Sequence, residues 1–171
     1  MQKTRSGDAR LAALDLLGAV LDDGASLGEA DTEAVDDRDR AYARHLAYGT
    51  LRWLSALEWL AARLLKRPLK RKDRDIQRLL LLGLFQLWQD DTADHAAVHA
   101  TAACAGKQGK AWATGLINAV LRRFQREREA LLAALADDAA RHAHPAWLLD
   151  ALRNDWPGDW PVIVDANNRP G

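Results

Sequence analysis

Apolar residues recur every three or four positions along most of the chain, which is the spacing of amphipathic α-helices. A first leucine stripe predicts a helix over residues 8–21. A second pattern opens at Asp39 and continues to Leu64. Gly49 predicts a bend or break within it, because glycine costs about 1 kcal/mol in a helix interior. Pro68 follows in a basic connection and ends this element.

The segment from Arg74 to Gln89 is apolar almost all round, which predicts a helix at the centre of a bundle. Gly83 would let a neighbouring helix approach closely. We expect Gln86 to be a buried amide with a hydrogen-bond partner, since an unpaired one would cost about 1–3 kcal/mol. A further helix is expected over residues 95–105, capped by Thr92 or Asp94, with Gly106 and Gly109 bracketing the turn after it.

The next helix has two contrasting faces. Its apolar face, expected to enter the core, comprises Trp112, Leu116, Ile117, Val120, Leu121 and Phe124. Its opposite face carries Gly115, Asn118, Arg122 and Arg126. This polar face is either a plain solvated surface or a binding surface, and residues 127–135 either continue the helix or form a separate piece.

The C-terminal segment differs in texture, with three of the tryptophans and four of the prolines after residue 140. Two short helices are expected, at about 145–153 and 157–165, with prolines in their first turns. No stretch shows convincing strand alternation. The pattern therefore predicts an all-α protein.

Charge is separated along the chain although the net charge is zero. Between Asp15 and Arg40, nine acidic residues face two arginines, a local charge of −7, whereas residues 63–78 hold eight basic and two acidic residues, a local charge of +6. A basic surface of this kind suits RNA phosphates. The alternative is a solvated surface in which cations offset helix C-terminal dipoles.

Catalytic and metal chemistry has little support in the sequence. Cys104 is the single cysteine, so a disulfide within the chain is excluded, and its alanine-rich surroundings favour a buried apolar role over pairing with His99. His95 and His99 share a helix face without a third ligand, so no metal site is predicted. The longest apolar run, 79–87, is too short to cross a membrane, and a cytoplasmic location is expected.

Four motifs in order resemble a known family. They are DRDRAYARHLAYGTLRW (37–53), LLLLGLFQLW (79–88), DHAAVHATAACA (94–105) and GLINAVLRRF (115–124). They resemble the NusB-like N-terminal domain of the RsmB (Sun, Fmu) family of ribosomal RNA cytosine-5 methyltransferases. The tail, from HPAWLLDALRNDW to NNRPG, resembles the segment that leads into the methyltransferase domain of that family.

The resemblance implies an all-helical fold of two packed three-helix bundles over residues 1–138, with a helical linker over 139–171. It implies an RNA-binding domain that helps to position 16S ribosomal RNA. The S-adenosylmethionine site and the catalytic cysteines are expected in a further domain, so we expect no cofactor, no catalytic residue and no methylation here. Implied partners are ribosomal RNA and the protein's own catalytic domain, with the chain a monomer and not membrane-bound.

Electrostatics rather than motif transfer gives the candidate RNA contacts. They are Arg5, Arg10, Lys70, Arg71, Lys72, Arg122 and Arg123. Within the family motif, Gly115 and Asn118 are expected to serve close helix packing and a buried amide contact as much as ligand binding. Two other interpretations stay open: a free-standing NusB-type transcription antitermination factor, and a module that docks on its own catalytic domain through the tryptophan-rich tail.

Overall fold

A computed structural model describes residues 8–28, 30, 36–136 and 139–169 of the chain. All regular structure in these ranges is helical, which confirms the all-α prediction. The α-helices are α1 (Ala9–Leu21), α2 (Asp37–Arg52), α3 (Leu54–Leu64), α4 (Arg74–Gln89), α5 (Asp94–Lys107), α6 (Trp112–Ala136), α7 (Ala146–Asp155) and α8 (Trp160–Asn167). Two short 3-10 helices, η1 (Arg71–Asp73) and η2 (Ala139–His142), precede α4 and α7.

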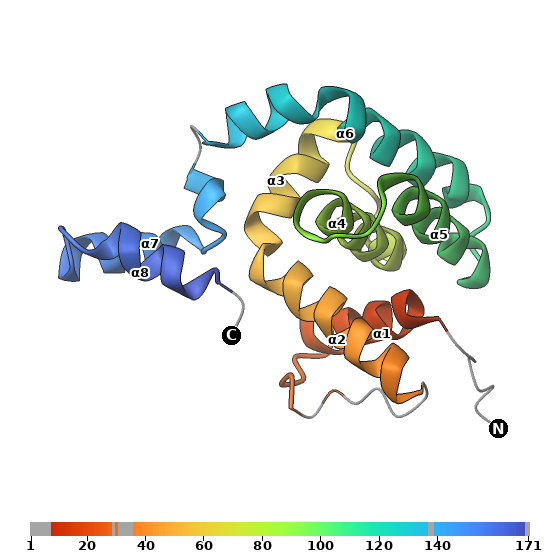
Figure 1. Cartoon of the computed structure of the whole chain (residues 1–171), viewed down its shortest axis with the longest axis horizontal. Coiled ribbons are helices and arrows are strands. Elements are labelled where there is room, and N and C mark those ends of the chain that lie inside the picture. Colours follow the sequence, from red (N-terminus) through yellow and green to blue (C-terminus); the bar gives the residue numbers. More distant parts are fainter. Residues whose placement is uncertain (1–7, 29, 31–35, 137–138, 170–171) are drawn as a thin grey trace.

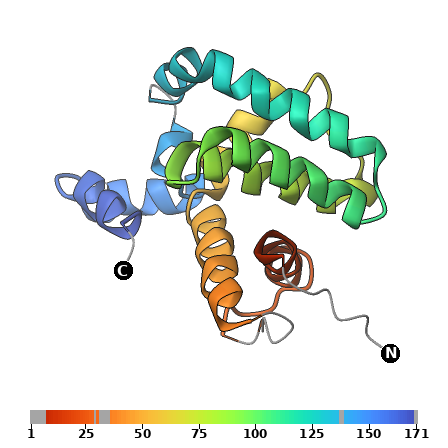
Figure 2. The same cartoon turned by 45° about the vertical axis from the view of Figure 1, so that its right-hand side comes forward.

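Helix α4 occupies the centre of the bundle (Figure 1), and it packs against α1, α2, α3, α5 and α6. Its apolar residues from Ile76 to Leu87 are almost all buried, as expected for a helix that is hydrophobic all round. Helices α1 and α2 pair on one side of it, while α5 and α6 lie side by side on the other (Figure 2).

Two predictions about α4 are confirmed. A Cβ atom on Gly83 would lie 2.7 Å from a methyl carbon of Leu121, so the glycine allows α6 to approach. The Gln86 side chain is fully buried and satisfied. Its Oε1 accepts from Nε of Arg10 at 2.9 Å, and its Nε2 donates to Oγ1 of Thr101 at 3.1 Å. This amide therefore joins α1, α4 and α5.

The expected bend at Gly49 is wrong, because the chain breaks four residues later, at Trp53 between α2 and α3. Gly49 lies inside α2, and a Cβ atom there would come within 2.0 Å of the Phe85 ring. The glycine thus serves close packing between α2 and α4 rather than a change of direction.

The expected cap of α5 is also wrong. Helix α5 begins at Asp94, its N-cap residue is Ala93, and no side chain caps it. The Thr92 hydroxyl instead donates to Oδ2 of Asp90, which lies in the preceding turn. The turn after α5 is confirmed at Gly109, whose φ is +76°, whereas Gly106 lies within the helix.

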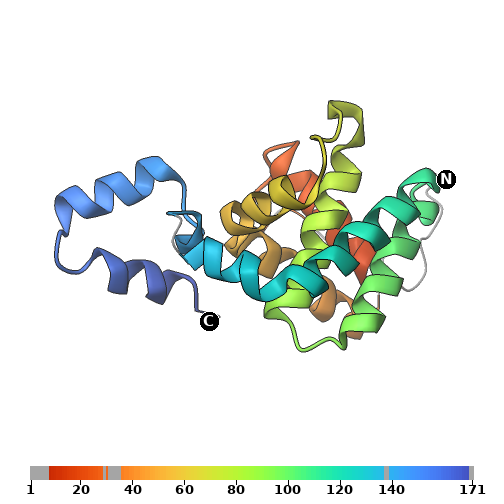
Figure 3. The same cartoon turned by 90° about the horizontal axis from the view of Figure 1, so that it is seen from above.

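Helices α7 and α8 form a hairpin that projects from the bundle (Figure 3). Buried His142 of η2 holds its base: its ring meets Trp160 edge-on at 5.0 Å, and its carbonyl accepts from Nδ2 of Asn168 at 2.9 Å. Two helices were expected here, but α8 starts at Trp160 rather than Pro157, with Pro161 in its first turn. The boundary at residue 138 lies outside the described residues and stays a prediction.

None of the described helices combines the length and apolar composition needed to cross a membrane.

Candidate nucleic-acid interface

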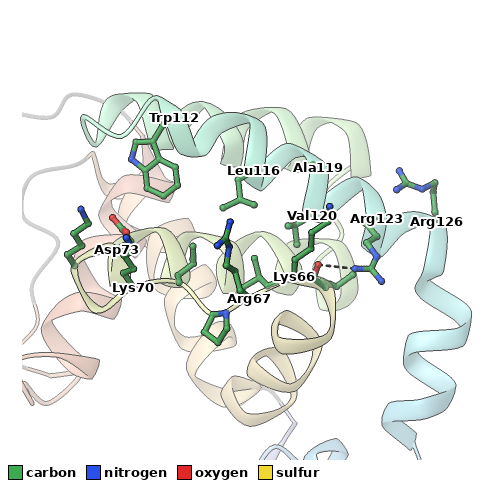
Figure 4. Close-up of a pocket in the computed structure, with 15 residues that line it drawn as sticks. Lys66, Arg67, Lys70, Asp73, Trp112, Leu116, Ala119, Val120, Arg123 and Arg126 are labelled. Atoms are coloured by element: carbon green, nitrogen blue, oxygen red, sulfur yellow. Dashed lines mark hydrogen bonds between the residues drawn. The ribbon is translucent and has the colours of Figure 1, made fainter.

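A groove of about 770 Å³ lies between α6 and the loop that joins α3 to η1 (Figure 4). We call it the α6 groove. Its lining comprises Leu64, Leu65, Lys66, Arg67, Pro68, Leu69, Lys70, Lys72 and Asp73 from the loop side, and Trp112, Leu116, Ala119, Val120, Arg123 and Arg126 from α6.

The local sequence explains why the loop runs beside α6. Leu65 takes an extended conformation at the end of α3, and Pro68 prevents the helix from continuing. Lys70 is again extended before the single turn of η1. The residues from 65 to 70 therefore form an irregular loop whose basic side chains are exposed.

Lys110 fixes the far end of this loop. Its ammonium group donates to the Lys72 carbonyl oxygen at 2.8 Å and pairs with the carboxylates of Asp73 at 3.1 Å and Asp75 at 2.6 Å. Desolvation lowers the pKa of Lys110, but the two carboxylates outweigh it and raise that pKa overall. Lys110 therefore offsets part of the negative charge that Asp73 and Asp75 bring to this end of the groove.

Arg123 joins the two walls. Its Nη1 donates to the Leu64 carbonyl oxygen at 3.1 Å, and its Nε donates to Oε1 of Glu127 at 2.9 Å. The last carbonyl oxygens of a helix lack partners within it, so this bond satisfies one at the end of α3. The dashed line in Figure 4 marks this contact. Arg123 therefore shapes the groove as well as adding charge to it.

The remaining cations of the groove are exposed. Across the described ranges no carboxylate forms an ion pair with Lys66, Arg67, Lys70, Lys72 or Arg126. Unpaired guanidinium and ammonium groups on two facing walls are the arrangement that phosphate groups favour.

The groove also has apolar surface, from Leu65, Leu69, Leu116 and Val120. Trp112 lies at one end of it (Figure 4). The expected burial of Trp112 in the core is wrong, since 57% of it is exposed. It is the first residue of α6 and lines the groove, whereas Ile117, Leu121 and Phe124 of the same face are buried.

The structure gathers three of the seven contact candidates, Lys70, Lys72 and Arg123, in the α6 groove. Arg71 points to the other side of the loop, into a second recess that it shares with Arg74 and Glu58. Arg122 is exposed on the outer face of α6.

Arg10 lies far along the chain from these residues in a different environment. Its guanidinium bonds Gln86 and lies 5.9 Å from the Tyr42 ring centre, between α1, α2 and α4. Arg5 lies outside the described residues. As RNA contacts, all seven candidates stay predictions.

Three cations and one exposed aromatic residue of the groove are absent from those candidates: Lys66, Arg67, Arg126 and Trp112. Lys66 and Arg67 begin the basic run KRPLKRK (66–72). The candidates included only the cations of its second half, although the whole run indicates a basic surface. Arg128, which is close to Arg126 in sequence, turns inward and donates to the Leu87 carbonyl oxygen at 2.6 Å. Only the fold distinguishes these two arginines.

The expectation for Gly115 and Asn118 is wrong. A Cβ atom on Gly115 would meet nothing within 4 Å, so close helix packing does not require this glycine. The Asn118 side chain is half-buried, and its Oδ1 accepts from Nε of Arg122 at 3.1 Å along the helix surface. The beginning of the polar face of α6 is therefore solvated.

Cys104 is buried, and burial together with the Asp8 carboxylate raises its thiol pKa to about 12. Its Sγ contacts the Ala100 carbonyl oxygen at 3.3 Å and Asp8 at 3.7 Å. A thiol with such a pKa is not a nucleophile at neutral pH. His95 and His99 are exposed, and within the described ranges no three histidine, cysteine or acidic side chains gather as a metal site.

Comparisons with known proteins match two parts of this chain. The model of the NusB family matches residues 7–126. A model described as the ferredoxin-like domain of RsmF/B-like methyltransferases matches residues 144–171, which hold the α7–α8 hairpin and were expected to be a linker.

Ribosomal RNA small subunit methyltransferase B of Pseudomonas putida is 50% identical over 163 residues, which cover 93% of this chain and 37% of the relative. The protein of the same name from Pseudomonas syringae pv. tomato is 48% identical over 93% of this chain and 36% of its own length. That of Erwinia tasmaniensis is 39% identical over 94% of this chain and 38% of its own length.

The chain thus spans little more than a third of the length of the curated relatives it matches. The resemblance carried by the four sequence motifs is confirmed. The chain belongs to the NusB family, and over most of its length it is similar to ribosomal RNA small subunit methyltransferase B.

Proposed function

We propose that this chain is the RNA-binding part of a small-subunit ribosomal RNA methyltransferase and that the α6 groove holds the phosphate backbone of its substrate. One observation carries the proposal: in the described part of a chain whose net charge is zero, exposed cations without carboxylate partners lie along the loop side of a groove, and Arg126 faces them from α6. Five or six charges on one face provide the sequence-independent attraction that holds RNA at ordinary salt concentrations.

Methyl transfer is assigned to the part of the relatives that lies beyond the matched region. In this proposal the chain supplies substrate binding, while S-adenosylmethionine and the reacting cysteines belong to the other part. Ribosomal RNA is the partner, and the cytoplasm, where ribosomes are assembled, is the location. The resemblance motivates both assignments.

A second role has its own observation. Trp147 and Val162 of the α7–α8 hairpin are 70% and 69% exposed, and Trp156 is 55% exposed. These residues lie in the segment that matches a ferredoxin-like domain. We infer that this apolar surface packs against the remainder of that domain in the longer protein. The same match disfavours a free-standing antitermination factor.

Binding of a fluorescent RNA fragment from the small ribosomal subunit, measured by anisotropy across a salt series, tests the main proposal. The variant Lys66→Gln/Lys70→Gln/Arg126→Gln should bind more weakly, and its slope of log affinity against log salt should fall by about 2, at about 0.7 per lost contact with single-stranded RNA. The control is Arg38→Gln/Arg44→Gln, which removes two exposed arginines of α2, one charge fewer than the groove variant. Equal affinity and slope for the groove variant and the native chain would contradict the proposal.

A further inference from the structure

The exposed indole of Trp112 calls for an explanation that phosphate binding does not give. It belongs to the apolar face of α6, yet 57% of it is open to solvent at the end of the α6 groove. The indole ring of tryptophan is large, flat and mostly apolar. Covering it with another flat apolar group is energetically favourable. A backbone phosphate offers no such group.

We propose that the α6 groove binds an unpaired stretch of RNA, with one base stacked on the Trp112 indole. The proposal rests on the RNA-binding function given above and adds to it the class of RNA and a residue that discriminates between classes. Proteins that bind single strands combine cations that follow the backbone with aromatic side chains on which bases stack. Paired bases are hidden within the duplex, so a double-stranded ligand would use only the cations.

The arrangement along α6 fits a strand that lies lengthwise in the groove. Trp112 and Lys70 mark one end, and Arg123 and Arg126 mark the other (Figure 4). Fourteen residues at 1.5 Å each separate Trp112 from Arg126, so the groove extends for about 21 Å along the helix axis. That length accommodates several nucleotides beyond the stacked one.

The groove surface is divided in the way that a single strand requires. Leu116 and Val120 continue the apolar surface from Trp112 along α6, while Lys66, Arg67 and Lys70 face them from the loop. Bases can therefore turn toward α6 and phosphates toward the loop. Lys110 pairs with the carboxylates of Asp73 and Asp75, so the wall formed by the loop keeps most of its positive charge.

The test compares three labelled RNA probes of equal charge per strand: an oligoadenylate of about ten nucleotides, an abasic strand of the same length, and the oligoadenylate paired with its complement. Native protein should bind the oligoadenylate most tightly. Trp112→Ala should weaken that binding roughly 5- to 150-fold, the range that losing one stacked base gives, and should leave the abasic strand unaffected. Trp112→Phe should recover most of the affinity.

Trp156→Ala is the matched control, because Trp156 is 55% exposed but belongs to the α7–α8 hairpin. It should bind all three probes as the native protein does. The slope of affinity against salt should be the same for Trp112→Ala and native protein, since no cation is removed.

The outcomes separate the two proposals. If the oligoadenylate binds with the expected salt dependence but Trp112→Ala behaves like Trp156→Ala, or if the duplex binds as tightly, stacking is overturned and phosphate binding stands. If no RNA probe binds in a manner that depends on the groove cations, the RNA-binding function itself is overturned. Displacement of the oligoadenylate by an equimolar acidic amphipathic peptide, with Trp112→Ala weakening the peptide and not the RNA, would identify a protein partner instead and overturn the stacking proposal.

Discussion

The guanidinium group of Arg123 donates a hydrogen bond to the carbonyl oxygen of Leu64 across 3.1 Å and so ties α6 to the end of α3. Leu64 is the last residue of α3, and the loop that forms the opposite wall of the α6 groove begins directly after it. The distance between the two walls therefore depends on this contact. Arg126, one turn further along α6, lines the same groove without a carboxylate partner in the described ranges.

We expect Arg123→Gln and Arg126→Gln to differ in stability although both remove one positive charge from the groove. Arg123→Gln should lower the midpoint of urea unfolding, because the Leu64 carbonyl oxygen loses its donor. Arg126→Gln should leave the midpoint within the error of the native value. Both should weaken RNA binding. Equal midpoints for the two variants would show that Arg123 contributes charge alone.

Gly49 lies where α2 packs on α4, and Gly115, in an open position of α6, serves as its control. Gly49→Ala should lower the free energy of unfolding by about 3 kcal/mol, because its Cβ atom would collide with the Phe85 ring. Gly115→Ala should raise it by about 0.5–1 kcal/mol, since the site is open and alanine favours a helix. Urea unfolding measures both. A tolerated Gly49→Ala would mean that Phe85 can move aside at little cost.

The buried Gln86 amide should stabilise the folded state through its hydrogen-bond partners rather than through the volume that it fills. Gln86→Leu keeps the size but leaves the Thr101 hydroxyl and the Arg10 guanidinium without their bonds, so the free energy of unfolding should fall by about 1–3 kcal/mol. The double variant Gln86→Leu/Thr101→Val should lose less than the sum of the two single variants, because it also removes the stranded hydroxyl. Strict additivity would show that the two groups are not coupled.

Asp90 should make stability depend on pH in the acidic range. Burial alone would raise the pKa of Asp90, but hydrogen bonds from Thr92, His45 and Tyr42 outweigh it and lower that pKa below 3.8. A carboxyl group with a lowered pKa in the folded state stabilises the protein above its unfolded pKa. That contribution is lost as the pH falls through the folded value.

Asp90→Asn should therefore flatten the fall in unfolding free energy as the pH drops below about 4. Urea unfolding at a series of acidic pH values measures the effect. Asp91→Asn, a change at the exposed neighbouring position, should retain the native profile. If the two variants showed the same pH dependence, the hydrogen bonds to Asp90 would not stabilise the folded state.

The sequence predicts most helices well because their apolar periodicity is long and regular. The predicted span of α4 agrees with the structure at both ends, and the roles of Gly83 and Gln86 follow from a helix that is apolar on every side. The break between α2 and α3 escapes prediction because nothing in the local sequence marks Trp53. The role of Gly49 escapes it too, since the Phe85 ring that packs on this glycine comes from another helix.

Only part of the candidate interface can be predicted from the sequence. KRPLKRK and the arginines after Asn118 are visible as basic clusters, but nothing local shows that they form facing walls. The direction of each side chain depends on distant partners: Arg10 is drawn to Gln86, and Arg128 to the Leu87 carbonyl oxygen. The exposure of Trp112 likewise follows from its place at the groove that the fold forms between α6 and the loop.

Helix α6 runs without interruption from Trp112 to Ala136, a length of about 37 Å. Its first half forms a wall of the groove, and its far end approaches η2, which packs against α3 and carries the α7–α8 hairpin. One continuous helix thus spans the distance between the α6 groove and the η2 end of the bundle, from which the hairpin with exposed Trp147 and Trp156 projects. Under the proposed function, the length of α6 contributes to the distance between a strand in the groove and whatever covers Trp147 and Trp156, so inserting or deleting a turn of α6 should shift which nucleotide is presented to the rest of the longer protein.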